Sequence, residues 1–103
     1  MSNNKIRKIA KAYIRKIEKN GIPVKEAYIF GSMIKEKNYY GSDIDICVIS
    51  SFFGKDRQKE RVRLMNLRQG ISDLIEPHPY SVVDFQNPFD ILANEIKETG
   101  MKL

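Results

Sequence analysis

The chain has 103 residues, enough for one domain with a modest hydrophobic core. Its composition, 42% hydrophobic and 30% charged with a formal net charge of +5, is typical of a globular protein, and no low-complexity stretch or repeat indicates a tail or a solenoid. Because no apolar run is long enough to cross a bilayer and the first residues lack the hydrophobic segment of a secretory signal, the sequence predicts a cytoplasmic protein.

The first 70 residues carry the hydrophobic patterns of two helices and two strands. Apolar residues recur at helical spacing from Ile6 to Ile17, so the first helix is amphipathic and ends before Gly21. A second helix, with less regular apolar spacing, ends at Gly70. The strands are expected at about 25–30 and 43–49, and the second helix at about 56–69.

The last third of the chain predicts one more strand, at about 74–76, and one more helix. Asn87 is a favourable N-cap with Pro88 at the first helical position, and the helix ends near Gly100. Its buried stripe is expected to consist of Phe89, Leu92, Ala93 and Ile96. Helices that flank a small mixed β-sheet make this an α/β fold.

Two aspartates one residue apart begin the second predicted strand. Because side chains alternate along a strand, Asp43 and Asp45 lie on one face while Ile44 and Ile46 point into the core. The usual rise separates the two carboxylates by roughly 6.6 Å along the strand, close enough to reach one divalent cation or a metal pair. An amphipathic strand with two solvated carboxylates explains the pattern equally well when it is taken alone.

A Gly-Ser turn lies upstream of the two aspartates. Gly31 follows the apolar run 27–30, where a strand must bend sharply and bring its backbone near another group. Ser32 offers a hydroxyl, and the amides of Ser32 and Met33 would open a short segment whose N–H groups favour an anion. An ordinary strand-to-helix corner explains the turn by itself, but together with the aspartates the turn favours a phosphate site.

This combination resembles the nucleotidyltransferase superfamily of DNA polymerase β, in which Gly-Ser is followed, after a short loop, by Asp-x-Asp on the next strand. Within that superfamily the chain is most similar to the minimal, MNT-type nucleotidyltransferases, which consist of little beyond the catalytic domain. The resemblance implies a single domain of this kind over residues 1–103, with the polymerase β-like fold. It rests on Gly31, Ser32, Ser42, Asp43 and Asp45.

The resemblance also implies a third carboxylate on a later strand, for which Asp73, Glu76 and Asp84 are candidates. We select Glu76, because residues 74–81 resemble the family's strand of apolar residue, acid and Pro-x-Pro-Tyr. Glutamate in place of the more usual aspartate lengthens the arm by one methylene. Asp73 lies an odd number of residues from Glu76 and cannot share its strand face, so it is expected to end the preceding turn. Asp84 is expected to be an exposed or capping acid.

The family's chemistry implies roles for these residues. By resemblance, Asp43 and Asp45 would hold two magnesium ions, and Glu76 would hold the ion near the attacking hydroxyl or act as general base. The substrate would be ATP or another nucleoside triphosphate, with its β and γ phosphates at the backbone of Gly31 and Ser32.

Two further loop positions bear on nucleotide binding. Met33 stands where many relatives carry an arginine directly after Gly-Ser. Lys35 is predicted to supply that charge, with Lys37 as the alternative, although either lysine could simply be solvated. Ser42 occupies the position that commonly precedes the first aspartate, and we include it among the predicted nucleotide-binding residues.

The chain leaves no residues for a separate domain that recognises the acceptor. Minimal relatives often occur beside a helical HEPN-type protein as its antitoxin, and some attach AMP to a tyrosine of that partner, so the resemblance implies a protein adenylyltransferase with such a partner. Transfer to RNA or to a small molecule such as an aminoglycoside stays open, as does assembly into a homo-oligomer. A second hypothesis is a non-catalytic antitoxin subunit that neutralises its partner by binding alone.

Other features of the sequence have simpler explanations. Basic residues concentrate at 5–16 and 57–68, where they form solvated helix faces or, as a third hypothesis, a nucleic-acid-binding surface. Cys47 falls within an apolar strand, which predicts a buried thiol. His78, the only histidine, is expected to be structural, with substrate contact as the alternative.

Overall fold

The computed structural model of the protein describes residues 3–31 and 43–103. The helices in these ranges are α1 (Asn3–Lys19), α3 (Arg57–Leu67), α4 (Val82–Gln86) and α5 (Ile91–Thr99). The strands are β1 (Glu26–Phe30), β2 (Ile44–Ile49), β3 (Ile75–Tyr80) and β4 (Met101–Lys102). They form one sheet in the order β3-β2-β1-β4, in which β2 and β3 are parallel and the other pairs are antiparallel. The sheet is therefore mixed, and the predicted α/β fold is confirmed.

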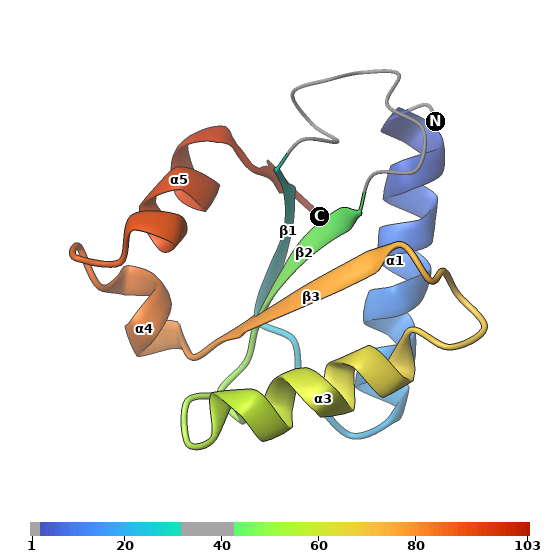
Figure 1. Cartoon of the computed structure of the whole chain (residues 1–103), viewed down its shortest axis with the longest axis horizontal. Coiled ribbons are helices and arrows are strands. Elements are labelled where there is room, and N and C mark those ends of the chain that lie inside the picture. Colours follow the sequence, from blue (N-terminus) through green and yellow to red (C-terminus); the bar gives the residue numbers. More distant parts are fainter. Residues whose placement is uncertain (1–2, 32–42) are drawn as a thin grey trace.

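Helices cover both faces of this sheet, with α1 on one side, α4 and α5 on the other, and α3 across the lower end in the view of Figure 1. The core between the sheet, α1 and α3 contains Ile6, Ala10, Tyr13, Ile17, Ile29, Ile44, Ile46, Leu64 and Ile75. The core between the sheet, α4 and α5 contains Phe30, Cys47, Ile49, Tyr80, Phe85, Ala93 and Ile96. Strand β2 gives alternate side chains to the two cores, which explains its almost continuous apolar sequence.

The elements of the first 70 residues lie close to their predicted positions. Asp56 is the N-cap of α3, and its side chain accepts a hydrogen bond of 3.2 Å from the backbone N–H of Lys59. Gly70 follows the end of α3 with a φ of +81°, a conformation that favours glycine. Cys47 is buried as predicted, and burial raises the pKa of its thiol to about 12.

Strand β3 is longer than the predicted strand, which ended at Glu76. It continues through Pro77 and Pro79, residues that normally interrupt a strand. The carbonyls of Leu74 and Tyr80 accept hydrogen bonds from β2 and the residue after it, at 2.6 and 3.0 Å. Because backbone groups alternate in direction along a strand, the two prolines face the outer edge of the sheet, where a missing N–H breaks no ladder bond.

Arginines of α3 and of its C-cap cover this outer edge of β3. Arg68 donates a hydrogen bond of 2.9 Å to the carbonyl of Ile75, and Arg57 donates one of 3.3 Å to the carbonyl of Pro79. The edge strand thus has donors for two of its outward carbonyls and prolines at two of its outward amide positions. Both features prevent the edge from pairing with another strand.

The last third of the chain differs from the prediction of a single helix that begins at Asn87. A short helix, α4, begins after Ser81, whose hydroxyl accepts from the Asp84 N–H at 3.0 Å, and Asn87 is its C-cap. The carboxylate of Asp90 then caps α5 by accepting from the Ala93 N–H at 2.9 Å. Phe89 lies before this cap and is 89% exposed, so its predicted burial is wrong.

The rest of the predicted stripe of this helix does face the core. Ala93 and Ile96 are fully buried, and Leu92 packs against them. Gly100 follows the helix, and the next two residues form the short strand β4, which was not predicted from the sequence and which pairs with Tyr28 and Ile29 of β1. Within residues 3–31 and 43–103, no helix is long and apolar enough to cross a membrane.

Tyr13 joins α1 to α3 by a buried hydrogen bond. Its hydroxyl donates to the carbonyl of Leu64 at 2.5 Å. Leu64 lies in the last turn of α3, where the N–H of Arg68 bonds to the carbonyls of Met65 and Asn66 instead. Burial raises the pKa of Tyr13, so the hydroxyl stays protonated as the donor to this buried helix carbonyl.

Replacing Tyr13→Phe keeps the ring but removes the donor from a buried carbonyl. We expect the free energy of unfolding to fall by about 1 to 2 kcal/mol, measured by urea unfolding with a parallel thermal scan. Tyr28→Phe is the control, because the Tyr28 hydroxyl makes only a long bond of 3.4 Å to Glu26 at a partly buried position. Equal losses in the two variants would contradict this role of Tyr13.

Candidate active site

The three predicted carboxylates come from the starts of two parallel strands. Asp45 of β2 lies directly opposite Glu76 of β3, and on its other side opposite Phe30 of β1. Since paired residues of neighbouring strands point to the same face, the Asp45 and Glu76 side chains lie side by side. Asp43 is exposed and comes just before β2, two residues from Asp45. The intervening Ile44 is fully buried, as the alternating pattern predicted.

Each of the two neighbouring carboxylates has a basic partner. His78 Nε2 lies 3.1 Å from Asp45 Oδ1, and because a carboxylate only accepts, the imidazole N–H is the donor. The His78 ring packs edge-on against Phe30 with 4.9 Å between ring centroids. Arg61 of α3 donates from Nη2 to Glu76 Oε2 at 2.9 Å. The two carboxylates are about one quarter exposed, so a ligand can reach both.

His78 and Arg61 were not among the site residues predicted from the sequence. The signal for His78 was present: it lies two residues after Glu76 and shares its face if the strand continues through Pro77. Because the predicted strand ended at Glu76, His78 was not placed on the same strand face as Glu76. Arg61 reaches Glu76 only because α3 packs along β3, and no local sequence pattern encodes that contact.

Gly31 lies against the Asp45 carboxylate. Its φ is +85°, which an L side chain rarely adopts. A Cβ at this position would lie 2.4 Å from Asp45 Oδ2 and 3.3 Å from its Cγ, closer than side chains tolerate. The predicted close approach of backbone to another group is therefore real. In this structure the group is a carboxylate.

The remaining predicted nucleotide-binding residues lie outside the described residues. They are Ser32, Lys35 and Ser42, together with Met33 and Lys37. Asp73 lies in the turn before β3, and Asp84 lies in the first turn of α4. Neither of these two acids shares the strand positions that bring Asp45 and Glu76 together.

The donor set fits magnesium in type. Asp45 and Glu76 present hard carboxylate oxygens on one face, with the exposed Asp43 two residues away. Across residues 3–31 and 43–103, no three His, Cys, Asp or Glu side chains are already clustered as a metal site. Asp45 and Glu76 would hold a cation after exchanging their present partners His78 and Arg61.

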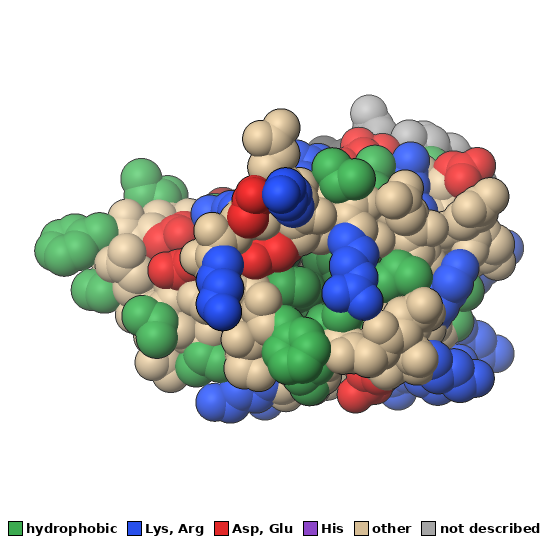
Figure 2. Space-filling view, turned by 90° about the horizontal axis from the view of Figure 1, so that it is seen from below, with side chains coloured by type: hydrophobic (Ala, Val, Ile, Leu, Met, Phe, Trp, Pro, Cys, Tyr) green, Lys and Arg blue, Asp and Glu red, His purple; other side chains and the backbone are tan. Residues whose placement is uncertain are grey.

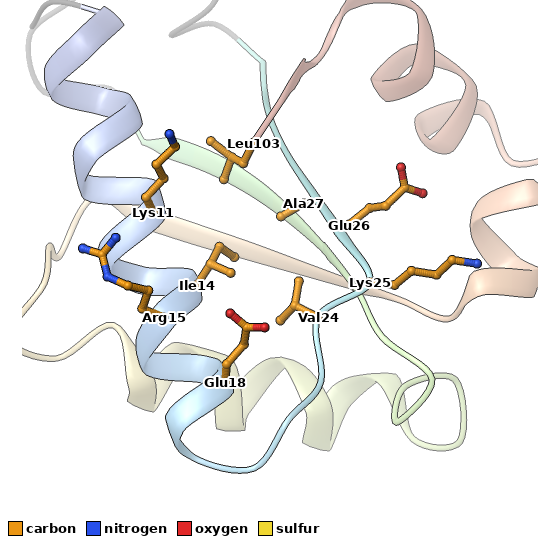
Figure 3. A pocket seen from close by; sticks show the side chains of 9 residues that line it. All are labelled: Lys11, Ile14, Arg15, Glu18, Val24, Lys25, Glu26, Ala27 and Leu103. Atoms are coloured by element: carbon orange, nitrogen blue, oxygen red, sulfur yellow. The ribbon is translucent and has the colours of Figure 1, made fainter.

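Two surface pockets differ in their relation to these carboxylates. One lies over β3, between α3 and α5, and its lining includes Arg61 and His78, the partners of the two carboxylates. The other lies between α1 and β1, where Figure 3 shows Lys11 and Arg15 on one side of an apolar floor that includes Ile14. The second pocket is lined by none of the predicted site residues.

A mixed sheet with neighbouring carboxylates at the starts of two strands, and a glycine turn packed against one of them, has the architecture of a nucleotidyl-transfer domain. The chain matches the family model described as Polymerase beta, Nucleotidyltransferase over residues 4–103. It therefore belongs to the polymerase β nucleotidyltransferase family, which confirms the resemblance inferred from the sequence. No curated protein matches the chain significantly.

Gly31→Ala is expected to displace the Asp45 carboxylate. Gly21→Ala is a matched control, since Gly21 has a φ of +87° but a Cβ added there would meet no atom within 4 Å. Both variants should lose about 1 kcal/mol of stability from the left-handed backbone. Only Gly31→Ala should separate Asp45 from His78.

The imidazole of His78 reports this separation, because it is the only histidine of the chain. Long-range nitrogen–proton NMR spectra should show shifted imidazole resonances in Gly31→Ala and unchanged ones in Gly21→Ala. Identical imidazole spectra in the two folded variants would show that Gly31 does not make room for the Asp45 carboxylate.

Proposed function

We propose that this nucleotidyltransferase domain moves AMP from ATP, with magnesium, to a hydroxyl group of a helical HEPN-type partner protein, and acts as that partner's antitoxin. The observation that carries the chemistry is the pairing of Asp45 with Glu76 on one sheet face, beside the close turn at Gly31. The choice of AMP and of a protein acceptor follows from the similarity to minimal nucleotidyltransferases.

In the proposed reaction, the acceptor oxygen forms a bond to the α-phosphorus of ATP. The bond from that phosphorus to the bridging oxygen breaks, and pyrophosphate leaves with the electron pair. Glu76 accepts the hydroxyl proton as general base, while Gly31 and Ser32 orient the β and γ phosphates through their backbone and Lys35 adds positive charge. Asp43, Asp45 and Glu76 would hold magnesium. The bound metal would neutralise phosphate charge and lower the pKa of the acceptor hydroxyl.

One observation favours a second candidate function, that of a non-catalytic antitoxin subunit. Asp45 and Glu76 already have hydrogen-bond partners, His78 and Arg61, without a metal. A protein that has lost catalysis could retain such pairs as purely structural contacts and neutralise its partner by binding alone. RNA and small molecules are the other acceptors that the proposed chemistry admits.

The test is transfer of label from α-labelled ATP, in the presence of magnesium, to a helical HEPN-type partner protein. We expect label on the partner with the wild-type protein, and at least about 100-fold less label with Asp45→Ala or Glu76→Gln. Loss of a residue that only hydrogen-bonds to a metal ligand lowers activity by up to about 100-fold, so loss of a ligand itself should cost at least as much. Asp73→Asn is the control, because this acid lies in the turn outside the site.

The two candidate functions give different results. Label that survives in Asp45→Ala and Glu76→Gln would exclude the proposed catalytic site. If none of the four nucleoside triphosphates labels the partner but a stable complex forms, and the same two variants bind the partner normally, the non-catalytic subunit is the correct function.

A further inference from the structure

The pocket over β3 lies next to the proposed catalytic carboxylates. It has a volume of about 120 Å³, and its lining includes Arg57, Arg61, His78, Tyr80 and Leu92. Arg61 and His78 also contact Glu76 and Asp45, at 2.9 and 3.1 Å. A group bound in this pocket therefore lies one side chain away from both carboxylates.

Arg57 is a pre-organised positive group in this pocket. Its Nε donates to the carbonyl of Pro79 at 3.3 Å, and its guanidinium carbon lies 4.3 Å from the centre of the Tyr80 ring. Tyr80 is itself fixed by a hydrogen bond of 3.1 Å to Asp90. Among the described residues, the two Nη groups of Arg57 have no partner, so they can bind an anion without losing an existing contact.

An exposed apolar ridge adjoins the pocket. It consists of Val83, Phe89 and Ile91, which are 77%, 89% and 83% exposed. Figure 2 shows hydrophobic side chains projecting from the end of the molecule that α4 and α5 form. Ile91 is followed by Leu92, which lines the pocket, so the ridge and the pocket meet at the first turn of α5.

We propose that the pocket and the ridge together form the docking surface for the acceptor, a protein segment that carries carboxylate and apolar side chains next to the hydroxyl it offers. This inference rests on the proposed function, since it names the acceptor class of the same site. The Arg57 guanidinium binds a carboxylate of the segment, the ridge covers its apolar side chains, and its hydroxyl reaches the Glu76 side of the site.

The two surfaces together favour a protein over RNA. Two of the three ridge side chains are aliphatic, and aliphatic groups bury well against protein but offer no stacking plane for a base. The pocket presents the guanidinium groups of Arg57 and Arg61 close together, an arrangement that suits one carboxylate. A strand of RNA would require positive charge along its path.

The test uses synthetic peptides that carry one tyrosine and one serine flanked by glutamate and leucine. A second peptide replaces the glutamates with glutamine, a third replaces the leucines with serine, and a short oligoribonucleotide serves as the RNA probe. Binding to the wild-type protein is measured by fluorescence anisotropy, and transfer by label from α-labelled ATP. We expect the parent peptide to bind about fivefold more tightly than the glutamine peptide, the size of one exposed charge pair.

Variants then assign each preference to its surface. Arg57→Gln should abolish the preference for glutamate, while Arg63→Gln, on the same helix and bonded to the Asn20 carbonyl, should keep it. Phe89→Ser with Ile91→Ser should abolish the preference for leucine, expected to be about tenfold for a buried aromatic contact. Phe52→Ser, at a separate exposed position, is the matched control. Each variant's unfolding curve checks that it is folded.

The outcomes separate this inference from the proposed function. Loss of each preference in its own variant supports the docking surface, even if no label is transferred and the proposed catalysis fails. Wild-type protein that binds none of the three peptides, or binds all three equally, overturns the docking surface even if a helical HEPN-type partner protein is labelled. Tighter binding of the oligoribonucleotide that depends on Arg57 overturns it in favour of an RNA acceptor.

Discussion

The register between β2 and β3 is the constraint on which the candidate site depends. It sets Asp45 opposite Glu76, and a slip of one residue would send the Glu76 side chain to the opposite, α1-covered face. Packing and hydrogen bonds oppose such a slip from both sides. Ile44 and Ile46 are fully buried beneath α1, and outer carbonyls of β3 accept hydrogen bonds from Arg57 of α3 and from Arg68, the C-cap of that helix. The core and the sheet edge therefore maintain the geometry of the carboxylates, although neither touches a ligand.

Two carboxylates held side by side on one sheet face repel each other unless positive charge lies nearby. In the described chain this charge comes from Arg61 at Glu76, and the Asp45 carboxylate is satisfied by the His78 N–H. A cation bound by the two carboxylates would do the same. In the proposed enzyme, metal binding is thus an exchange of partners rather than the filling of a bare acidic site. Its free energy depends on where Arg61 and His78 find new acceptors, and substrate phosphates are suitable acceptors for both.

Local patterns predicted the parts of this structure that local forces determine. The alternation of polar and apolar residues around Asp45 located β2 and its two faces, because neighbouring residues of a strand point to opposite faces. The extent of β3 could not be predicted in this way, since Pro77 and Pro79 are tolerated only where the strand is at the edge of the sheet. The separate helix α4 and the later start of the last helix were missed for a similar reason. Phe85 packs 5.4 Å from the Tyr28 ring across the sheet face, a contact that fixes α4 and moves the start of the last helix away from Asn87.

The basic residues of α3 and of its C-cap show that net charge alone does not identify a binding surface. Arg57, Arg63 and Arg68 all donate to backbone carbonyls, so these side chains hold neighbouring elements together instead of forming a freely solvated face. Much of the positive charge of residues 57–68 is therefore fixed by intramolecular contacts, which weakens the argument for a long phosphate-binding stripe along this segment. Arg57 and Arg61 are the arginines of α3 that line the pocket over β3 in the described chain. Positive charge concentrated at one point beside the carboxylates suits a single anionic group brought to the reaction, and this localisation favours a compact acceptor over an extended nucleic acid.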